Sequence, residues 1–187
     1  MKRRAFLKTC AVGVTVGPTS LAFLPTAQDQ TEKGEGNIDP GKLSELAYQH
    51  FIPNKRTCCE AILMAGCEAL GIQSDLVPDI GLGLAGGIGL QGKTCGVLSG
   101  CAMVISLAIA QKEKEYSKKK MPTFQAAGRI VSAFEEQAGN TECRALCGLD
   151  LTTAEGRKKL EGGVKEQTCA KLVKLGSELL VKELQKL

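Results

Sequence analysis

Cysteine is the residue of this chain whose number and placement could do chemistry. Nine cysteines occur in 187 residues. One of them, Cys10, lies near the N-terminus. The other eight are Cys58, Cys59, Cys67, Cys95, Cys101, Cys143, Cys147 and Cys169. As thiolates, such side chains bind iron–sulfur clusters or zinc, and as free thiols they exchange with disulfides. The chain has a single histidine, His50, so paired Cys–His catalysis has little support.

Several of these cysteines stand where a helix is expected to begin. Cys58 and Cys95 each directly follow a threonine, and Cys143 and Cys169 also lie close behind one. Threonine is a common N-cap, and the first turn of a helix carries free N–H groups and partial positive charge. That environment lowers a thiol pKa and suits the sulfurs of an anionic cluster. We therefore expect a metal cluster, or at least reactive thiols, rather than inert crosslinks.

The spacing of the cysteines suggests two groups. With a helical rise of ~1.5 Å per residue, Cys67 lies ~12 Å along its helix from Cys59, and Cys101 lies ~9 Å from Cys95. One cluster could not easily bind both members of either pair. We expect a first group of Cys59 (or Cys58), Cys95, Cys143 and Cys169. A second group would hold Cys67, Cys101 and Cys147, with Cys58 as a further candidate.

The stretch from residue 81 to residue 100 is rich in glycine and contains Cys95. It also matches the phosphate-loop pattern GxxxxGK[ST], but the residues before Gly87 are too glycine-rich for the buried strand that such a loop requires. No aspartate follows an apolar β-branched run, so a magnesium ligand is missing as well. We expect no nucleotide. Instead, the backbone N–H groups of Gly87, Gly89 and Gly92 are predicted to approach a bound cluster.

The N-terminus has the features of a targeting segment. Residues 2–8, KRRAFLK, resemble a twin-arginine export signal, and an apolar region too short to span a bilayer comfortably follows to Phe23. We expect residues 1–27 to be the signal, with cleavage after Ala22 or Ala27, and the mature protein to be periplasmic or otherwise extracytoplasmic. The twin-arginine route resembles one for proteins that fold and take up a cofactor before export. Residues 28–41 read as a flexible tether, which leaves 42–187 as the domain.

The net charge of the chain is misleading. The formal value is +4, from 24 basic and 20 acidic residues. The signal segment holds four basic residues and no acidic one, so the rest of the chain is neutral. A neutral domain gives no electrostatic case for binding nucleic acid or an anionic membrane.

The apolar pattern predicts an all-α fold. Apolar residues recur at helical spacing from Leu43 onward, and no alternating strand pattern appears. Thr57–Glu60 and Thr152–Glu155 each have the pattern of a capping box, and Thr94 can cap the apolar helix after it. We expect a single-domain bundle of five to seven helices with a glycine-rich loop.

Two boundaries in the second half of the chain follow from proline, glycine and charge. Pro122 at the start and Gly139 after the end bracket one expected helix. The charged residues 111–120 before it are predicted to be a solvated helix end and loop. The last helix is expected from about Val164 to the C-terminus.

Four segments together carry a family resemblance. They are residues 59–62 (CEAI), 83–100 (GLAGGIGLQGKTCGVLSG), 140–151 (NTECRALCGLDL) and Cys169. In combination they resemble the C_GCAxxG_C_C family of redox-active proteins, over roughly residues 43–180. The family cysteines then fall on Cys59, Cys95, Cys143 and Cys169. The resemblance implies an α-helical, redox-active domain, and haem-bearing relatives of split-Soret type pair such a domain with an iron–sulfur centre.

This chain departs from the family pattern in two ways. It has no CxxCH motif, so covalently attached haem is not expected. It also carries extra cysteines at positions 58, 67, 101 and 147, which leaves the number of clusters open.

These observations predict an exported redox protein that binds an iron–sulfur cluster of unknown type through its cysteines. Its simplest role is to carry electrons to or from a partner protein, rather than to be an enzyme with its own substrate. A metal-free thiol/disulfide redox protein or sensor is the first alternative. A disulfide-stapled binding module is the second. The oligomeric state stays open, a homo-oligomer included.

Overall fold

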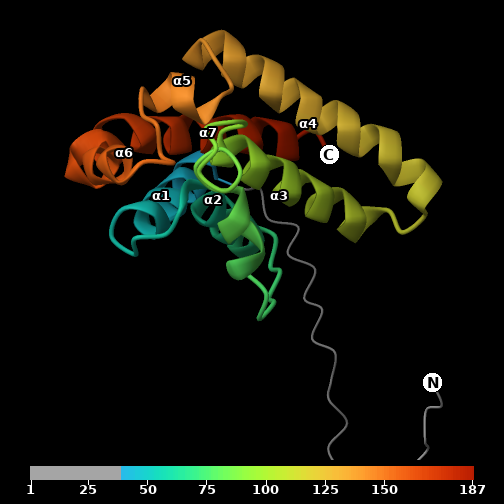
Figure 1. Cartoon of the computed structure of the whole chain (residues 1–187). Helices are drawn as coiled ribbons and strands as arrows, with labels where there is room; N and C mark the ends of the chain where they lie inside the picture. The colour runs from blue at the N-terminus through green and yellow to red at the C-terminus, as the bar shows by residue number, and fades with distance from the viewer. Residues whose placement is uncertain (1–38) are drawn as a thin grey trace, which may run out of the picture. The chain divides into compact units, whose positions relative to one another are not determined.

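Helices form the regular structure of residues 39–187, the part of the chain that the computed structural model describes. Within that part there are seven α-helices and no strand, which confirms the predicted all-α bundle (Figure 1). The α-helices are α1 (Pro40–Phe51), α2 (Cys58–Ala69), α3 (Gly96–Lys112), α4 (Tyr116–Ala138), α5 (Cys143–Cys147), α6 (Ala154–Lys159) and α7 (Ala170–Leu184). A 3₁₀ helix, η1 (Asp79–Leu84), follows α2, and a widened helical segment, η2 (Leu160–Cys169), leads into α7.

The core lies between α2, α3 and α7. Helix α2 packs against α1 and α3, and α7 contacts α1, α2, α3 and α4. Glycines let these helices approach closely. A Cβ added at Gly66 of α2 would lie 2.3 Å from the Val104 side chain, and one added at Gly176 of α7 would lie 2.1 Å from that of Val97. Helix α3 is apolar on most of its surface because it is covered from several sides.

The starts of α1 and α2 follow local capping rules. Asp39 caps α1 by accepting a hydrogen bond from the Gly41 N–H at 2.9 Å, and Pro40 occupies the first helical position. Helix α1 therefore begins at residue 40, two residues before the expected start of the domain at residue 42. The predicted capping box at Thr57 is confirmed: the Thr57 hydroxyl accepts from the Glu60 N–H, and the Glu60 carboxylate accepts from the Thr57 N–H.

Two predicted helix starts are wrong. Helix α3 has Cys95 as its N-cap, without a side-chain cap, because Thr94 pairs instead with Glu142 in a short antiparallel bridge. Helix α4 begins at Tyr116, so part of the charged run is helical and Pro122 lies inside the helix. An ion pair of 2.7 Å between Glu115 and Lys118 in the first turn favours this earlier start. The predicted end before Gly139, which has a φ of 80°, is confirmed.

Of the last two helices, one starts elsewhere than predicted. Thr153 caps α6 through the Gly156 N–H at 3.0 Å, because the Thr152 hydroxyl donates to Asp150 and Glu155 pairs with Lys159. The capping box at Thr152–Glu155 is therefore wrong. The start expected at about Val164 is confirmed: η2 is broken at Gly163, whose φ is 134°, and the chain is helical from Val164 through the rest of η2 into α7, which begins at Ala170.

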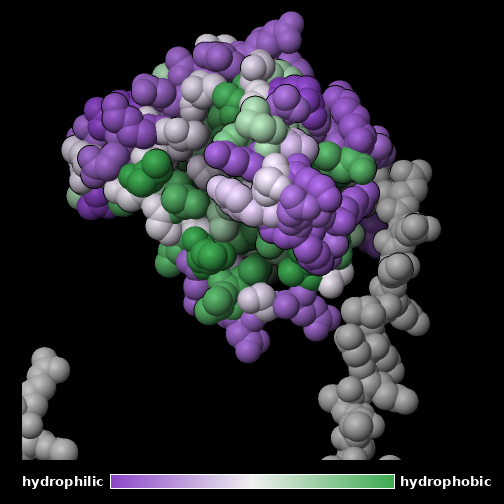
Figure 2. Space-filling view, turned by 90° about the vertical axis from the view of Figure 1, so that its right-hand side faces the viewer, coloured by the Kyte–Doolittle hydropathy of each residue, from purple (hydrophilic) through white to green (hydrophobic). Residues whose placement is uncertain are grey.

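The surface of the described part includes an exposed apolar segment around η1. Figure 2 shows a face on which hydrophobic residues gather. Leu76, Ile80 and Leu82 are exposed by 68%, 59% and 54%. In residues 39–187 no helix has the length and apolar character needed to cross a bilayer. The expected signal segment, and the tether up to residue 38, lie outside the described residues.

Candidate functional site

Five cysteines from four segments of the chain line one small cavity, which we call the thiol site. They are Cys58, Cys95, Cys143, Cys147 and Cys169. The cavity measures about 20 Å³, and Val97, Leu146 and Leu172 complete its wall. A volume of this size holds about one water molecule. The thiols are therefore packed closely around a small space.

Cys58 is positioned by the start of α2. It is the first residue of that helix, directly after the capping box of Thr57 and Glu60. Glu60 is 3% exposed and also forms an ion pair of 3.6 Å with Arg56. The thiol of Cys58 lies against Gly96, where an added Cβ would come within 2.5 Å of its Sγ. The start of α3 thus approaches Cys58 as closely as it does only because residue 96 has no side chain.

Cys95 and Cys143 are brought together by backbone pairing between two loops. The Cys95 N–H donates to the Thr141 carbonyl at 2.8 Å, and the Cys143 N–H donates to the Lys93 carbonyl at 2.7 Å. The Arg144 N–H donates to the Gly92 carbonyl at 3.1 Å. These bonds place the starts of α3 and α5 side by side, so that both cysteines reach the same cavity.

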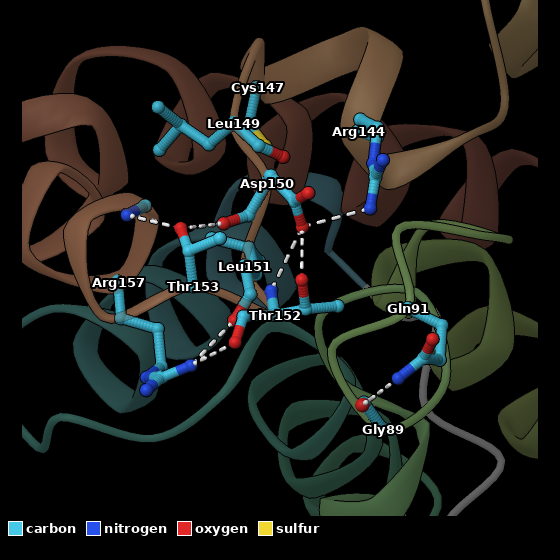
Figure 3. Close-up of polar contacts among 11 residues, drawn as sticks. Gly89, Gln91, Arg144, Cys147, Leu149, Asp150, Leu151, Thr152, Thr153 and Arg157 are labelled. Carbon is cyan, nitrogen blue, oxygen red and sulfur yellow. Dashed lines mark hydrogen bonds and ion pairs between the residues drawn. The ribbon is translucent and has the colours of Figure 1, made fainter.

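Cys147 is carried by α5, and the residues after it are held by a network of polar contacts (Figure 3). The Asp150 Oδ1 atom accepts from the Thr152 N–H at 3.1 Å, from the Thr152 hydroxyl at 2.6 Å and from Arg144 at 2.9 Å. The Arg157 guanidinium donates to the carbonyls of Leu151 and Thr152 at 3.0 and 2.9 Å. The segment between α5 and α6 is thereby tied to both of its neighbours.

A larger pocket of about 380 Å³ adjoins the thiol site, and we call it the cation pocket. All thiol-site cysteines except Cys95 line both spaces. The cation pocket has an apolar wall that includes Phe51, Leu90, Leu151 and Leu160. Four cationic side chains and one carboxylate also line it; they are Lys55, Arg56, Arg157, Lys165 and Glu161.

Sequence reasoning missed these charged residues. They come from two segments about a hundred positions apart, and the surplus of positive charge is hidden by the neutrality of the domain as a whole. The available signals were the basic pair Lys55-Arg56 just before Cys58 and the basic run that follows Arg157.

Burial raises the pKa values of the thiols. Removal from water is the largest cause for Cys58, Cys95 and Cys143, and it raises the pKa of Cys169 to about 12. The N–H groups of Gly86 and Gly96 oppose the rise at Cys58, and Lys165 opposes it at Cys169. The prediction that helix starts lower the pKa of these thiols is therefore wrong for the metal-free protein. Desolvation outweighs the N–H groups.

The remaining cysteines lie in the core, and we call them the inner cysteines: Cys59, Cys67 and Cys101. Cys59 and Cys101 are fully buried. Burial raises the pKa of Cys101 to about 12, and proximity to Cys59 adds to the rise. The Cys101 thiol donates to the Gly176 carbonyl at 3.5 Å. Cys67 is 3% exposed. Of the two expected groups, the structure therefore joins Cys58 and Cys147, not Cys59, to Cys95, Cys143 and Cys169.

The glycine-rich loop supports the site differently from what was expected. The N–H groups of Gly89 and Gly92 donate within the loop, to the carbonyls of Gly83 and Gly86 at 2.9 and 3.0 Å. A Cβ at Gly87, whose φ is 68°, would lie 2.3 Å from the Lys93 backbone nitrogen. These glycines fold the loop tightly onto itself. Gly86, by contrast, lines the cation pocket, and its N–H group is among those that contact the Cys58 thiol, as is that of Gly96.

No preformed metal-ion site is present in residues 39–187: no three or more His, Cys, Asp or Glu side chains there are arranged to hold an ion. His50 is not part of the thiol site, since its Nε2 atom lies 2.7 Å from the Glu68 carboxylate. All eight cysteines of the described part are free thiols.

The fold and the site define an all-α protein with a buried group of thiols. Residues 56–182 match the family described as "Putative redox-active protein (C_GCAxxG_C_C)", and the chain belongs to this family. A protein of Archaeoglobus fulgidus, itself named only "Uncharacterized protein", is 30% identical over 112 residues, which is 56% of this chain and 74% of the relative. No solved structure matches the chain significantly.

Proposed function

We propose that the protein is an exported electron carrier that binds an iron–sulfur cluster at the thiol site. One observation carries the proposal: five cysteines from four segments of the chain converge on a single cavity. Four of them also line a pocket of about 380 Å³. A protein that needed only a compact core would not require so many thiols at one point.

The donor set fits such a cluster. Cysteine thiolates are its usual ligands, and Cys58, Cys95, Cys143 and Cys169 would hold it, with Cys147 as a fifth thiol nearby. The small cavity alone has room for about one water, so the cluster would also occupy the cysteine-lined part of the adjoining cation pocket, which measures about 380 Å³, and would leave the part along Phe51, Leu151 and Leu160 free. When bound, the cluster would supply one-electron transfer. The N–H groups of Gly86 and Gly96 would stabilise negative charge at the Cys58 sulfur.

Burial of the thiols favours the metal-bound alternative over free reactive thiols. A thiol whose pKa is raised by burial is mostly protonated at neutral pH and is a poor nucleophile. Iron binding would deprotonate these thiols and stabilise the thiolates. The disulfide-stapled module has less support, because all eight described cysteines are free thiols.

A second candidate function is metal-free thiol/disulfide exchange. It is favoured by the pair Cys143 and Cys147, which lie one helical turn apart on α5 and both line the thiol site. Such a pair could cycle between dithiol and disulfide with two electrons.

Anaerobic purification of the chain from cells that possess the twin-arginine route separates these candidates. We expect stoichiometric iron and acid-labile sulfide, with a visible absorption band that bleaches on reduction. Protein without iron or sulfide that titrates reversibly with two electrons per chain would overturn the cluster and support the dithiol. Cysteines that are fully oxidised and redox-inert would overturn both.

The proposed export rests on Arg3 and Arg4 of the signal-like segment. Replacing both with lysine preserves the charge but removes the twin arginines. We expect this variant to stay in the cytoplasm while the unchanged chain reaches the periplasm, as measured by cell fractionation. Equal export of both chains would contradict the route. In its compartment the protein would exchange electrons with a partner protein.

A further inference from the structure

The walls of the cation pocket combine two chemistries. Phe51 and Leu151 are almost fully buried and give it an apolar surface. Lys55, Arg157 and Lys165 give it positive charge, and they come from the chain before α2, from α6 and from η2. A small-molecule site is typically an apolar hollow of this size with a few polar groups that orient the ligand.

The positive charges of the pocket are poorly matched by carboxylates. Arg56 pairs with Glu60 at 3.6 Å. Arg157 donates to backbone carbonyls, which leave its charge uncompensated. The Lys165 Nζ atom lies 5.1 Å from the centre of the Phe51 ring. Among residues 39–187, neither Lys55, Arg157 nor Lys165 forms an ion pair, and Glu161 is the single carboxylate in the pocket wall.

We infer that the cation pocket binds a small anionic molecule with an apolar body, such as an aromatic or aliphatic carboxylate or sulfonate. Its anionic group would be held by Lys55 and Lys165, and its apolar part would lie against Phe51, Leu151 and Leu160. The pocket is also lined by thiol-site cysteines, so the ligand would lie next to the thiols. This binding site goes beyond the proposed cluster, because its walls exist without one.

A pair of fluorescent probes tests the inference on the purified full chain. The anionic probe is 8-anilinonaphthalene-1-sulfonate, and the neutral probe is N-phenyl-1-naphthylamine, which has the same apolar body. In the variant Lys55→Gln/Lys165→Gln we expect the affinity for the anionic probe to fall about tenfold, as the loss of two nearby charges predicts. The affinity for the neutral probe should change less than about twofold. Raising the salt concentration should lower the affinity for the anionic probe and leave the affinity for the neutral probe unchanged.

Two controls locate the binding. Lys120→Gln removes one exposed charge on α4, away from the pocket wall, and should leave both affinities unchanged. Ile80→Ser disrupts the exposed apolar residues around η1, where a hydrophobic probe could bind without a pocket. This variant should also bind both probes as before. Leu160→Trp fills the pocket and should weaken both probes.

The inference is overturned if the double lysine variant binds the anionic probe as tightly as the unchanged chain. It is also overturned if both probes weaken equally in that variant, or if Ile80→Ser abolishes binding. Circular dichroism of each variant verifies that it is folded, and the lysine changes at the surface keep the test informative if Leu160→Trp misfolds. Iron is measured in the same samples. Absence of iron would overturn the proposed cluster without changing the probe result, so the two failures are distinguishable.

Discussion

Cys58 and Cys59 are neighbours in the sequence, yet they belong to different regions of the molecule. Cys58 lines the thiol site with four other cysteines, whereas Cys59 is fully buried in the helical core. Successive residues of an α-helix point about 100° apart, so a helix that turns one side chain toward a cavity turns the next away from it. Their burial and neighbours, more than their residue type, separate a candidate ligand from a packing residue.

The same contrast holds for the other cysteines. The thiol site is built from helix starts and loops joined by a few backbone hydrogen bonds. The inner cysteines lie within α2 and α3, and each is at most 3% exposed. Buried thiols in such surroundings behave as small apolar residues. We therefore expect changes at the inner cysteines to affect stability, and changes at the thiol site to affect metal binding.

The largest expected effect on stability is that of alkaline pH on the metal-free protein. The pKa values of Cys59, Cys101 and Cys169 are raised to about 12 by burial. Unfolded thiols titrate near pH 8.5, so above that pH the unfolded chain loses protons first and the free energy of unfolding falls. Each thiol contributes at most about 1.4 kcal/mol per pH unit.

Urea denaturation at pH 7, 9 and 10.5, with reductant and chelator present, measures this loss of stability. The double variant Cys59→Ala/Cys101→Ala should show a smaller decrease than the unchanged chain. A free energy of unfolding that stays constant up to pH 10.5 would show that burial does not govern these thiols.

Gly96→Ala is expected to have the next largest effect. The added Cβ would lie 2.5 Å from the Cys58 sulfur, so either Cys58 or the start of α3 must shift. We expect a loss of about 1–3 kcal/mol in the free energy of unfolding, typical of overpacking, together with reduced iron content. The matched control is Gly128→Ala on α4, where an added Cβ meets nothing within 4 Å and should stabilise the helix by about 0.5–1 kcal/mol. Similar behaviour of the two variants would contradict the close packing at Gly96.

Cys59→Ser should destabilise the metal-free protein by about 1–2 kcal/mol, because it buries a hydroxyl among apolar side chains. Cys147→Ser, at a half-buried position of the thiol site, should cost less. Thermal unfolding of the two variants under reducing conditions compares them. If Cys147→Ser proved the more destabilising, the assignment of the inner cysteines to packing would fail.

The smallest effect is expected at Asp150, which anchors the segment after α5. Hydrogen bonds from Thr152 are the main cause of its lowered pKa, and Arg144 adds to it. The stabilisation is present above the unfolded pKa, near 3.9, and is lost as pH falls through the lower folded pKa. Asp150→Ala should therefore melt slightly below the unchanged chain at pH 7, with the gap closing at pH 2–3. A gap that persists at low pH would point to a cause other than the carboxylate charge.

Local rules predicted much of the fold and little of the geometry of the site. Helical periodicity and the capping box at Thr57 are local signals, and both led to correct predictions. The pairing of residues 92–95 with residues 141–144 joins distant parts of the chain, so no local pattern could reveal it. The same holds for the choice between Cys58 and Cys59, which depends on how α2 is rotated against α3. The helix start predicted at Pro122 was wrong because the ion pair between Glu115 and Lys118 favours a first turn that begins before the proline.

The most direct test of the central claim compares the two neighbouring cysteines. Cys58→Ala and Cys59→Ala make the same chemical change one residue apart in α2. Iron and acid-labile sulfide per chain are measured after anaerobic purification of both variants and the unchanged protein. We predict that Cys58→Ala loses most of its iron and sulfide, whereas Cys59→Ala retains both at the level of the unchanged protein. Loss of the cluster from Cys59→Ala, with retention in Cys58→Ala, would contradict the assignment of the thiol site.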